Sequence, residues 1–155
     1  MKALLLHANR YEARVESQSQ RLGDTEPDEL EPQVEDDFGV GVRDGALVIE
    51  HMEECLVVLF QVEQGDGDKA VKRICKDAKK IADIVGTRRI MLGAFGHLSD
   101  KWPENPEISK EIARQVVEIC KGFVGYQVQS SHFGYNKTLL LDIKGHQNAI
   151  KHRSY

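Results

Sequence analysis

The segment that decides the fold is residues 55–95, which read CLVVLFQVEQGDGDKAVKRICKDAKKIADIVGTRRIMLGAF. It opens with a continuous apolar run at 55–62, which predicts a buried strand. Residues 68–85 follow with apolar side chains at helical spacing and lysines on the opposite face, so they predict an amphipathic helix. A second apolar run at 89–95 predicts another buried strand. This strand, helix and strand form the centre of the expected fold.

Further elements are expected on both sides of this segment. Asn105-Pro106-Glu107 predicts the start of a second helix, because asparagine caps a first turn well and proline fits the first helical position. We expect this helix to run to about Lys121. The remaining strands are expected at 4–6, 11–16, 126–130 and 138–144. This order predicts a single α/β domain over 1–155, with a mixed or barrel-like sheet and two helices on one face.

The segment 17–49 interrupts this pattern. Its residues 24–37 contain eight acids and no basic residue, and they predict an acidic loop. Asp44-Gly45, set between two apolar runs, predicts a hairpin after the loop. Without the eight carboxylates the formal net charge of −4 becomes +4, and the last 24 residues are modestly basic. That charge suits an anionic partner, although an ordinary solvated surface explains it equally well.

Composition excludes several classes of protein. With 41% hydrophobic and 30% charged residues, the 155-residue chain is typical of a globular domain. No apolar run approaches the roughly 20 residues of a membrane span, and the run at 4–6 is shorter than the roughly 7–15 residues of a signal-peptide core. We therefore expect a cytoplasmic protein without membrane contact. Cys55, Cys75 and Cys120 are odd in number and form no CxxC, which predicts free buried thiols.

Two polar side chains stand where an apolar run meets a glycine-bearing turn. His97 follows the run at 89–95 through Gly96, and Lys137 follows Gly134 and precedes the run at 138–144. A buried strand that runs into such a turn carries the next polar side chain to the edge of the sheet, where ligands tend to bind. His7, after the run at 4–6, is a third such residue. The pattern predicts a ligand site at the sheet edge.

The chemistry open to these residues is limited. His97 could carry a proton, donate a hydrogen bond or bind a metal, but no partner at helical spacing completes a metal pair, so we expect none. Lys137 could hold a phosphate or an oxyanion, and a lysine pointing to solvent is the alternative. The chain contains no GxSxG elbow and no glycine-rich phosphate loop. We therefore expect neither a serine nucleophile of that type nor a cofactor.

Several short motifs in the same order resemble the N-terminal editing domain of archaeal threonyl-tRNA synthetase. FGHLS is close to that family's AHLSS segment, FGYNK to its FGYYK and KGH to its CKGHP. The segments that carry the resemblance are 4–7, 53–57, 60–63, 95–99, 133–137 and 144–146. The resemblance implies a fold similar to that of D-aminoacyl-tRNA deacylase.

The family removes serine wrongly attached to threonine tRNA, so the resemblance implies a hydrolase that cleaves the ester at the tRNA 3′ end. It implies catalytic roles for Lys137 and His97. In the family, the 2′-hydroxyl of the tRNA is thought to position the attacking water, so no protein nucleophile is required. The resemblance also implies a homodimer and association with a threonyl-tRNA synthetase. The implied substrate contacts are His7, Gly96, Phe133, Gly134, Tyr135, Asn136 and His146.

The chain departs from the family pattern at two informative positions. Asn136 replaces the second tyrosine of FGYYK, and Ile150 aligns with a glutamate that contacts the substrate amino group. Glu63 or an acid of the segment 17–49 could replace that glutamate. The alternative function is a relative with altered specificity, or one that binds tRNA or an aminoacyl-adenosine without editing. An unrelated small-molecule hydrolase is a further alternative.

Overall fold

A computed structural model describes residues 1–30, 41–43 and 47–155. The predicted turn at Asp44-Gly45 and the part of the predicted acidic loop at 31–37 lie outside the described residues. The elements, in chain order, are β1 (Lys2–Gln18), the 3-10 helix η1 (Gln20–Leu22), β2 (Gly41–Arg43), β3 (Leu47–Gln61), α1 (Asp68–Val85), β4 (Arg89–Ala94), α2 (Pro106–Lys121), β5 (Gln127–Ser130), β6 (Tyr135–Ile143) and β7 (Ile150–Ser154).

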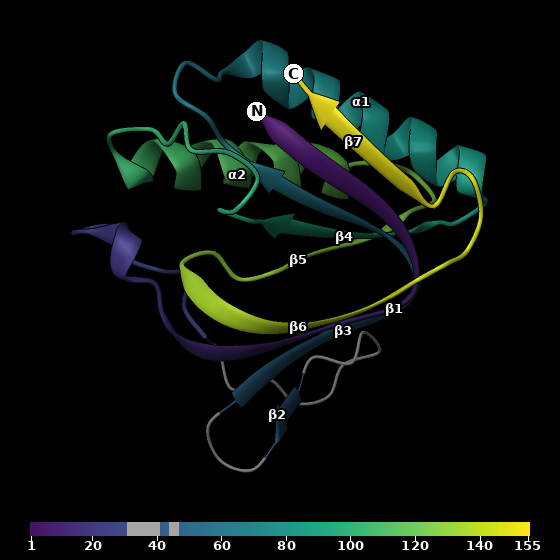
Figure 1. Ribbon diagram of the computed structural model, residues 1–155, viewed down its shortest axis with the longest axis horizontal. Helices are drawn as coiled ribbons and strands as arrows, with labels where there is room; N and C mark the ends of the chain where they lie inside the picture. Colours follow the sequence, from purple (N-terminus) through teal and green to yellow (C-terminus); the bar gives the residue numbers. More distant parts are fainter. Residues whose placement is uncertain (31–40, 44–46) are drawn as a thin grey trace.

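The described strands form one mixed sheet. Its central order is β5-β4-β3-β1-β6, while β2 pairs with β3 and β7 pairs with β1. β3, β4 and β5 are parallel, which requires a crossover between each pair, and α1 and α2 are those crossovers. Both helices lie on the same side of the sheet (Figure 1). The predicted mixed α/β fold is confirmed.

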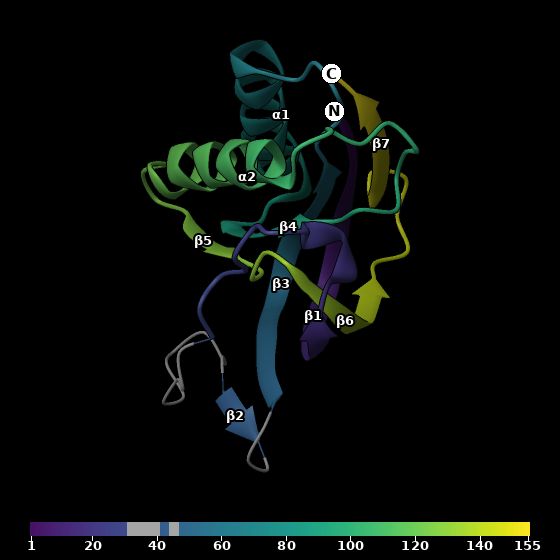
Figure 2. The same cartoon turned by 90° about the vertical axis from the view of Figure 1, so that its left-hand side faces the viewer.

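β1 connects the two halves of the sheet. The strands expected at 4–6 and 11–16 are a single strand of 17 residues, which pairs with β3 along one edge. Along its other edge, β7 occupies the first part and β6 the second. Figure 2 shows β1 and β3 extending well beyond the helices. β7 was not predicted, because its mostly exposed residues lack the apolar alternation of a strand.

Two apolar clusters lie on opposite faces of the sheet. The first joins α1 and α2 to the sheet and includes Leu5, Phe60 and Ile74. The second includes Tyr11 and Met52, and the inward side chains of β6 pack against it. Each large side chain buried in this way stabilises the fold by about 1.5–3 kcal/mol. At the start of β6, Tyr135 packs instead against Val15 of β1.

The predicted cap of α2 and the predicted free, buried cysteines are confirmed. Asn105 caps α2, because its side-chain oxygen accepts a hydrogen bond from the backbone N–H of Glu107 at 2.9 Å. Gly86 ends α1 with a φ of 77°, a conformation that suits glycine. All three cysteines are free and buried. No helix in the described part of the chain is long and apolar enough to cross a membrane.

Candidate functional site

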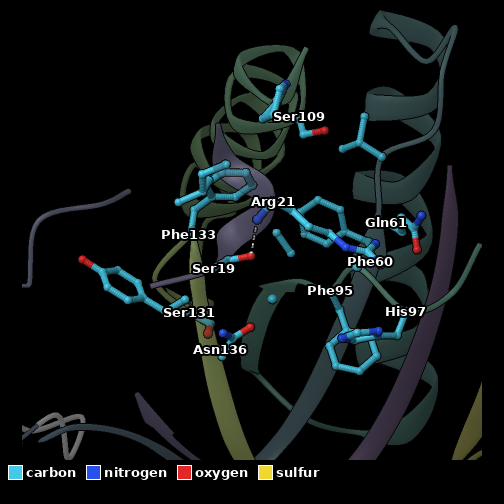
Figure 3. A pocket seen from close by; sticks show the side chains of 18 of the residues that line it. Ser19, Arg21, Phe60, Gln61, Phe95, His97, Ser109, Ser131, Phe133 and Asn136 are labelled. Atoms are coloured by element: carbon cyan, nitrogen blue, oxygen red, sulfur yellow. Dashed lines mark hydrogen bonds between the residues drawn. The ribbon is translucent and has the colours of Figure 1, made fainter. Parts of the chain in front are cut away.

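A cavity of about 750 Å³ opens beyond the carboxyl ends of the three parallel strands (Figure 3). β3 ends at Gln61, β4 at Ala94 and β5 at Ser130, and the residues that follow each end line the cavity. η1 and the first turn of α2 form further walls. Ligands in α/β proteins commonly bind at this edge of a parallel sheet.

The cavity brings together seven of the nine site residues predicted from the sequence. Figure 3 shows Phe133 and Asn136 on one side of it and His97 on the other. They come from segments far apart in the chain, the connection after β4 and the beginning of β6. The seven lining residues are Gly96, His97, Phe133, Gly134, Tyr135, Asn136 and Lys137.

Lys137 reaches the cavity because of its position on β6. Alternate residues of this strand face inward, so Lys137 shares a face with Leu139, which also lines the cavity. Only 10% of the Lys137 side chain is exposed. Its ammonium group donates hydrogen bonds to the Ser131 hydroxyl and to the backbone carbonyl of His132. The lysine is therefore a nearly buried cation in a cavity wall and does not point to solvent.

The anionic partner of Lys137 is Glu50, which lies on β3 and is 2% exposed. One carboxylate oxygen lies 3.5 Å from the Lys137 nitrogen. The same oxygen accepts hydrogen bonds from the backbone N–H and the Nδ1 of His132, both at 2.8 Å. The second oxygen accepts a hydrogen bond from the Tyr11 hydroxyl at 3.2 Å. Glu50, on β3, thus contacts β1 through Tyr11, β6 through Lys137 and the connection between β5 and β6 through His132.

These contacts explain the shifted pKa values of the group. Burial alone would raise the pKa of Glu50, but the hydrogen bond from His132 and the charge of Lys137 outweigh it, so the pKa lies below its ordinary value. Burial lowers the pKa of Lys137, and the charges of Glu50 and Asp28 only partly oppose that effect. Burial and the neighbouring Glu50 raise the pKa of Tyr11, so its hydroxyl remains a proton donor. The geometry is that of a buried ion pair.

Glu50 was not predicted as a site residue from the sequence. The sequence did contain one indication. Glu50 is two residues before Met52 in the same strand, so the two side chains lie on the same face of the sheet, and the Met52 side chain is buried. A charged residue at an inward strand position is unusual unless it is paired. The partner could not be identified, however, because Lys137 and His132 are more than 80 residues away in the chain.

His97 lies at the cavity rim, immediately after the turn that follows β4. Its exposed ring makes an edge contact with Phe95, with ring centres 5.2 Å apart. Gln61 fixes the residues that follow: its side-chain oxygen accepts hydrogen bonds from the backbone N–H groups of Leu98 and Ser99 at 2.8 and 2.9 Å. Its amide nitrogen donates to the Ser99 carbonyl at 2.8 Å. A buried side chain thereby holds the loop that carries His97.

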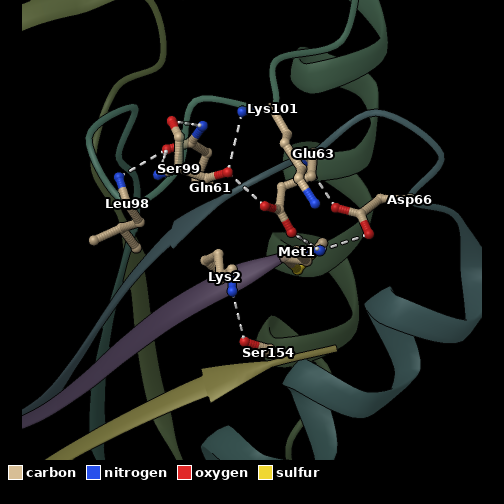
Figure 4. A network of polar contacts seen from close by, with 9 residues as sticks. All are labelled: Met1, Lys2, Gln61, Glu63, Asp66, Leu98, Ser99, Lys101 and Ser154. Atoms are coloured by element: carbon tan, nitrogen blue, oxygen red, sulfur yellow. Dashed lines mark hydrogen bonds and ion pairs between the residues drawn. The ribbon is translucent and has the colours of Figure 1, made fainter.

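Glu63 does not line the cavity, but it also holds the loop that carries His97. It accepts a hydrogen bond from the Ser99 hydroxyl at 2.5 Å, and its other oxygen lies 2.9 Å from the amino group of Met1 (Figure 4). Asp66 lies 2.7 Å from the same amino group. Burial would raise the pKa of Glu63, but Ser99 and the Met1 amino group hold it below its ordinary value. Both oxygens of Glu63 are therefore already bound by the protein.

Trp102 forms part of the cavity wall, where it packs on Gly96. A Cβ added to Gly96 would lie 2.0 Å from the Cη2 atom of Trp102, so only glycine allows this contact. The Arg21 guanidinium stacks over the indole at 4.6 Å from the ring centre. The indole is thus held between the connection after β4 and η1.

We expect Gly96→Ala to displace Trp102, because the new methyl group and the indole cannot occupy the same space. Trp102 is the only tryptophan, so its emission should shift to longer wavelength as the ring enters solvent. Unfolding in urea should show a loss of about 1–3 kcal/mol. Gly145→Ala is the matched control, since nothing lies within 4 Å of that added Cβ. An unchanged emission spectrum of Gly96→Ala would contradict this packing.

His7 and His146, the other two predicted site residues, lie together outside the cavity lining. The Nδ1 of His7 is 2.8 Å from the Nε2 of His146, and the His7 backbone N–H donates to Ala149 at 2.8 Å. Burial, Lys144 and His146 lower the pKa of His7. Among the described residues, no group of three or more metal-binding side chains occurs. The two histidines join the N-terminal half of β1 to the connection before β7.

Ile150, the position aligned with the family glutamate, does not line the cavity either. It lies at the start of β7, where it pairs with Leu6 of β1, and it is 58% exposed. The substrate amino group therefore has no carboxylate partner at this position.

Comparisons with known proteins agree with the predicted family. Residues 43–154 match the family described as the archaea-specific editing domain of threonyl-tRNA synthetase. The threonine–tRNA ligase of Staphylothermus marinus is 27% identical over 146 residues, covering 94% of this chain and 21% of that protein. The ligase of Thermofilum pendens is 29% identical over 148 residues, covering 94% of this chain and 21% of that protein. The chain spans about a fifth of the length of these relatives.

A solved structure shows the same fold. The c-Myc DNA Unwinding Element Binding Protein superposes with a TM-score of 0.59 and 11% sequence identity, covering 100% of this chain and 99% of that chain. The sequence motifs and the family match over residues 43–154 lead to the same assignment. The chain belongs to the archaea-specific editing domain family of threonyl-tRNA synthetase.

Proposed function

We propose that this domain hydrolyses the ester bond of mischarged aminoacyl-tRNA, with Ser-tRNA(Thr) as the substrate suggested by the family. The observation that supports this proposal best is the meeting of Lys137 and His97 on one cavity of about 750 Å³. A cavity of this size is within the roughly 300–1,000 Å³ typical of small-ligand sites. It can accept an aminoacyl-adenosine, the terminal part of the tRNA.

The proposed reaction needs no protein nucleophile. Water adds to the ester carbonyl carbon, and the resulting oxyanion is stabilised by the ammonium group of Lys137. The bond to the ribose 3′ oxygen then breaks, and this oxygen takes up the proton released by the attacking water and leaves as a hydroxyl. In this proposal His97, which is exposed at the rim, donates a hydrogen bond to the substrate. The backbone around Gly96 and Phe133 supplies the remaining contacts in this proposal.

The test is a direct assay of ester hydrolysis. Purified domain is incubated with Ser-tRNA(Thr), Thr-tRNA(Thr) and several D-aminoacyl-tRNAs, and the loss of the ester is followed against a no-protein control. We expect Ser-tRNA(Thr) to be hydrolysed fastest. The proposal would be refuted if none of these esters were hydrolysed and a non-hydrolysable seryl-adenosine amide did not bind. Binding of that amide without turnover would instead support the non-catalytic alternative.

A further inference from the structure

The carboxylate of Glu50 has no assigned role in the proposed reaction, although it is the most deeply buried charge beside the cavity. It is 2% exposed, and its contacts run to His132, Lys137 and Tyr11. A buried carboxylate is costly unless its oxygens are hydrogen-bonded and a cation lies near it. His132, Lys137 and Tyr11 meet these conditions here, and Lys137 and Tyr11 also line the cavity.

The first consequence concerns the charge of Lys137. The Lys137 nitrogen donates to the Ser131 hydroxyl, and both residues line the cavity. Without Glu50, the same pair could act as a serine nucleophile with a neutral lysine as its base, because burial favours the neutral amine. The carboxylate 3.5 Å away favours the ammonium form instead. An ammonium can stabilise an oxyanion but cannot accept a proton from serine.

The second consequence concerns the direction of the Lys137 side chain. Glu50 accepts both the backbone N–H and the ring Nδ1 of His132, each at 2.8 Å. The His132 carbonyl in turn accepts a hydrogen bond from the Lys137 nitrogen. The carboxylate therefore holds the cation directly and also holds the turn to which the cation is bound.

We propose that Glu50 is a positioning residue, which keeps Lys137 as an ammonium aimed into the cavity and so commits the site to water attack without a serine nucleophile. This inference rests on the proposed function. Within the part of the chain that the structure describes, three titratable groups face the pair. They are Tyr11 on β1, Asp28 in the segment after η1, and His132 in the connection before β6.

The first measurement does not depend on activity. The 13Cε chemical shift of Lys137, assigned by comparison with Lys137→Arg, is followed against pH in the wild type, in Glu50→Gln and in Glu54→Gln. Glu54 is the matched control, since it lies on the same strand but pairs with Lys144 at the surface. We expect Lys137 to titrate at lower pH in Glu50→Gln and to be unchanged in Glu54→Gln. An unchanged titration in Glu50→Gln would overturn the inference.

The second measurement is the pH profile of steady-state deacylation. In Glu50→Gln the alkaline loss of activity should begin at lower pH, and kcat at pH 8 should fall at least about tenfold with little change in KM. Glu50→Asp, which keeps the charge, should shift the alkaline limb less than Glu50→Gln does. Ser131→Ala should lower kcat by less than about tenfold. A seryl-enzyme ester, or complete loss of turnover in Ser131→Ala, would overturn the inference.

Two outcomes separate this inference from the proposed function. If no variant and no wild-type protein hydrolyses any aminoacyl-tRNA, the proposed function fails while the Lys137 titration still decides the role of Glu50. If Glu50→Gln does not fold, as judged by circular dichroism, Glu50→Asp is the second variant, because its side chain is one methylene shorter and withdraws the carboxylate from the Lys137 nitrogen. Titration of Lys137 at lower pH in that variant would support the same assignment, and an unchanged titration would contradict it.

Discussion

Replacing Lys137 with alanine should lower the rate of ester hydrolysis by about 100-fold or more, the loss typical of removing one donor to a developing oxyanion. The physical reason is the position of the ammonium group, which is nearly buried in the cavity wall and held by Ser131 and His132. Water in the space left by the side chain could solvate the oxyanion but would have to reorganise during the reaction. Single-turnover hydrolysis of Ser-tRNA(Thr) measures the effect.

Lys144→Ala is the matched control for this prediction. Lys137 lies near the start of β6, whereas Lys144 directly follows the end of that strand. Lys144 pairs with Glu54, whose side chain is 60% exposed. An exposed pair of this kind contributes only about 0–1 kcal/mol to stability. We expect its removal to change hydrolysis by less than about threefold. Equal losses in the two variants would mean that Lys137 acts only through the general charge of the domain.

Gly134→Ala should destabilise the domain by about 2–4 kcal/mol, the sum of a backbone penalty and a packing penalty. Gly134 has a φ of 93°, which side chains disfavour. An added Cβ would also lie 2.9 Å from the Cβ of Pro27 and 3.0 Å from the Cδ1 of Leu22. These residues belong to the segment that covers the start of β6, so the cavity should widen as it moves.

Urea unfolding followed by circular dichroism measures this loss. Gly145→Ala is again the control, because its added Cβ has no neighbour within 4 Å. We expect that variant to stay within about 0.5 kcal/mol of the wild type, as surface substitutions usually do. A Gly134→Ala variant as stable as Gly145→Ala would show that the segment around Pro27 adapts without cost. Hydrolysis by Gly134→Ala should fall as well, since Asn136 and Phe133 line the same wall.

Local sequence patterns predicted those elements that depend mainly on residues close together in the chain. The helix at 68–85 and the cap at Asn105 depend on residues close in the chain, and both are confirmed. The pattern could not show that β1 runs unbroken past Asn9, because that continuity comes from pairing with β3 and β6. β7 was missed for the same reason: its pairing with β1 is made by the backbone and leaves no apolar alternation.

The candidate site was predicted in part for a related reason. Apolar runs that meet glycine-bearing turns identified Lys137 and His97, which the fold brings to one cavity. A similar run identified His7, and the family resemblance added His146, although these two pair with each other outside the cavity lining. Glu50 belongs to no motif, and its position below Lys137 follows from the register of β3 and β6 on β1. Sequence spacing cannot supply such a register across strands.

The cavity lies beyond the ends of three parallel strands, so the residues that hold the sheet together are largely different from the residues that contact a ligand. Hydrogen bonding within the sheet fixes β3, β4 and β5, whereas much of the lining comes from the residues between β4 and α2 and between β5 and β6. Those connections can change in length or composition without altering a single strand pairing. Substitutions in these connections can therefore change which ligand fits the cavity while the sheet stays intact.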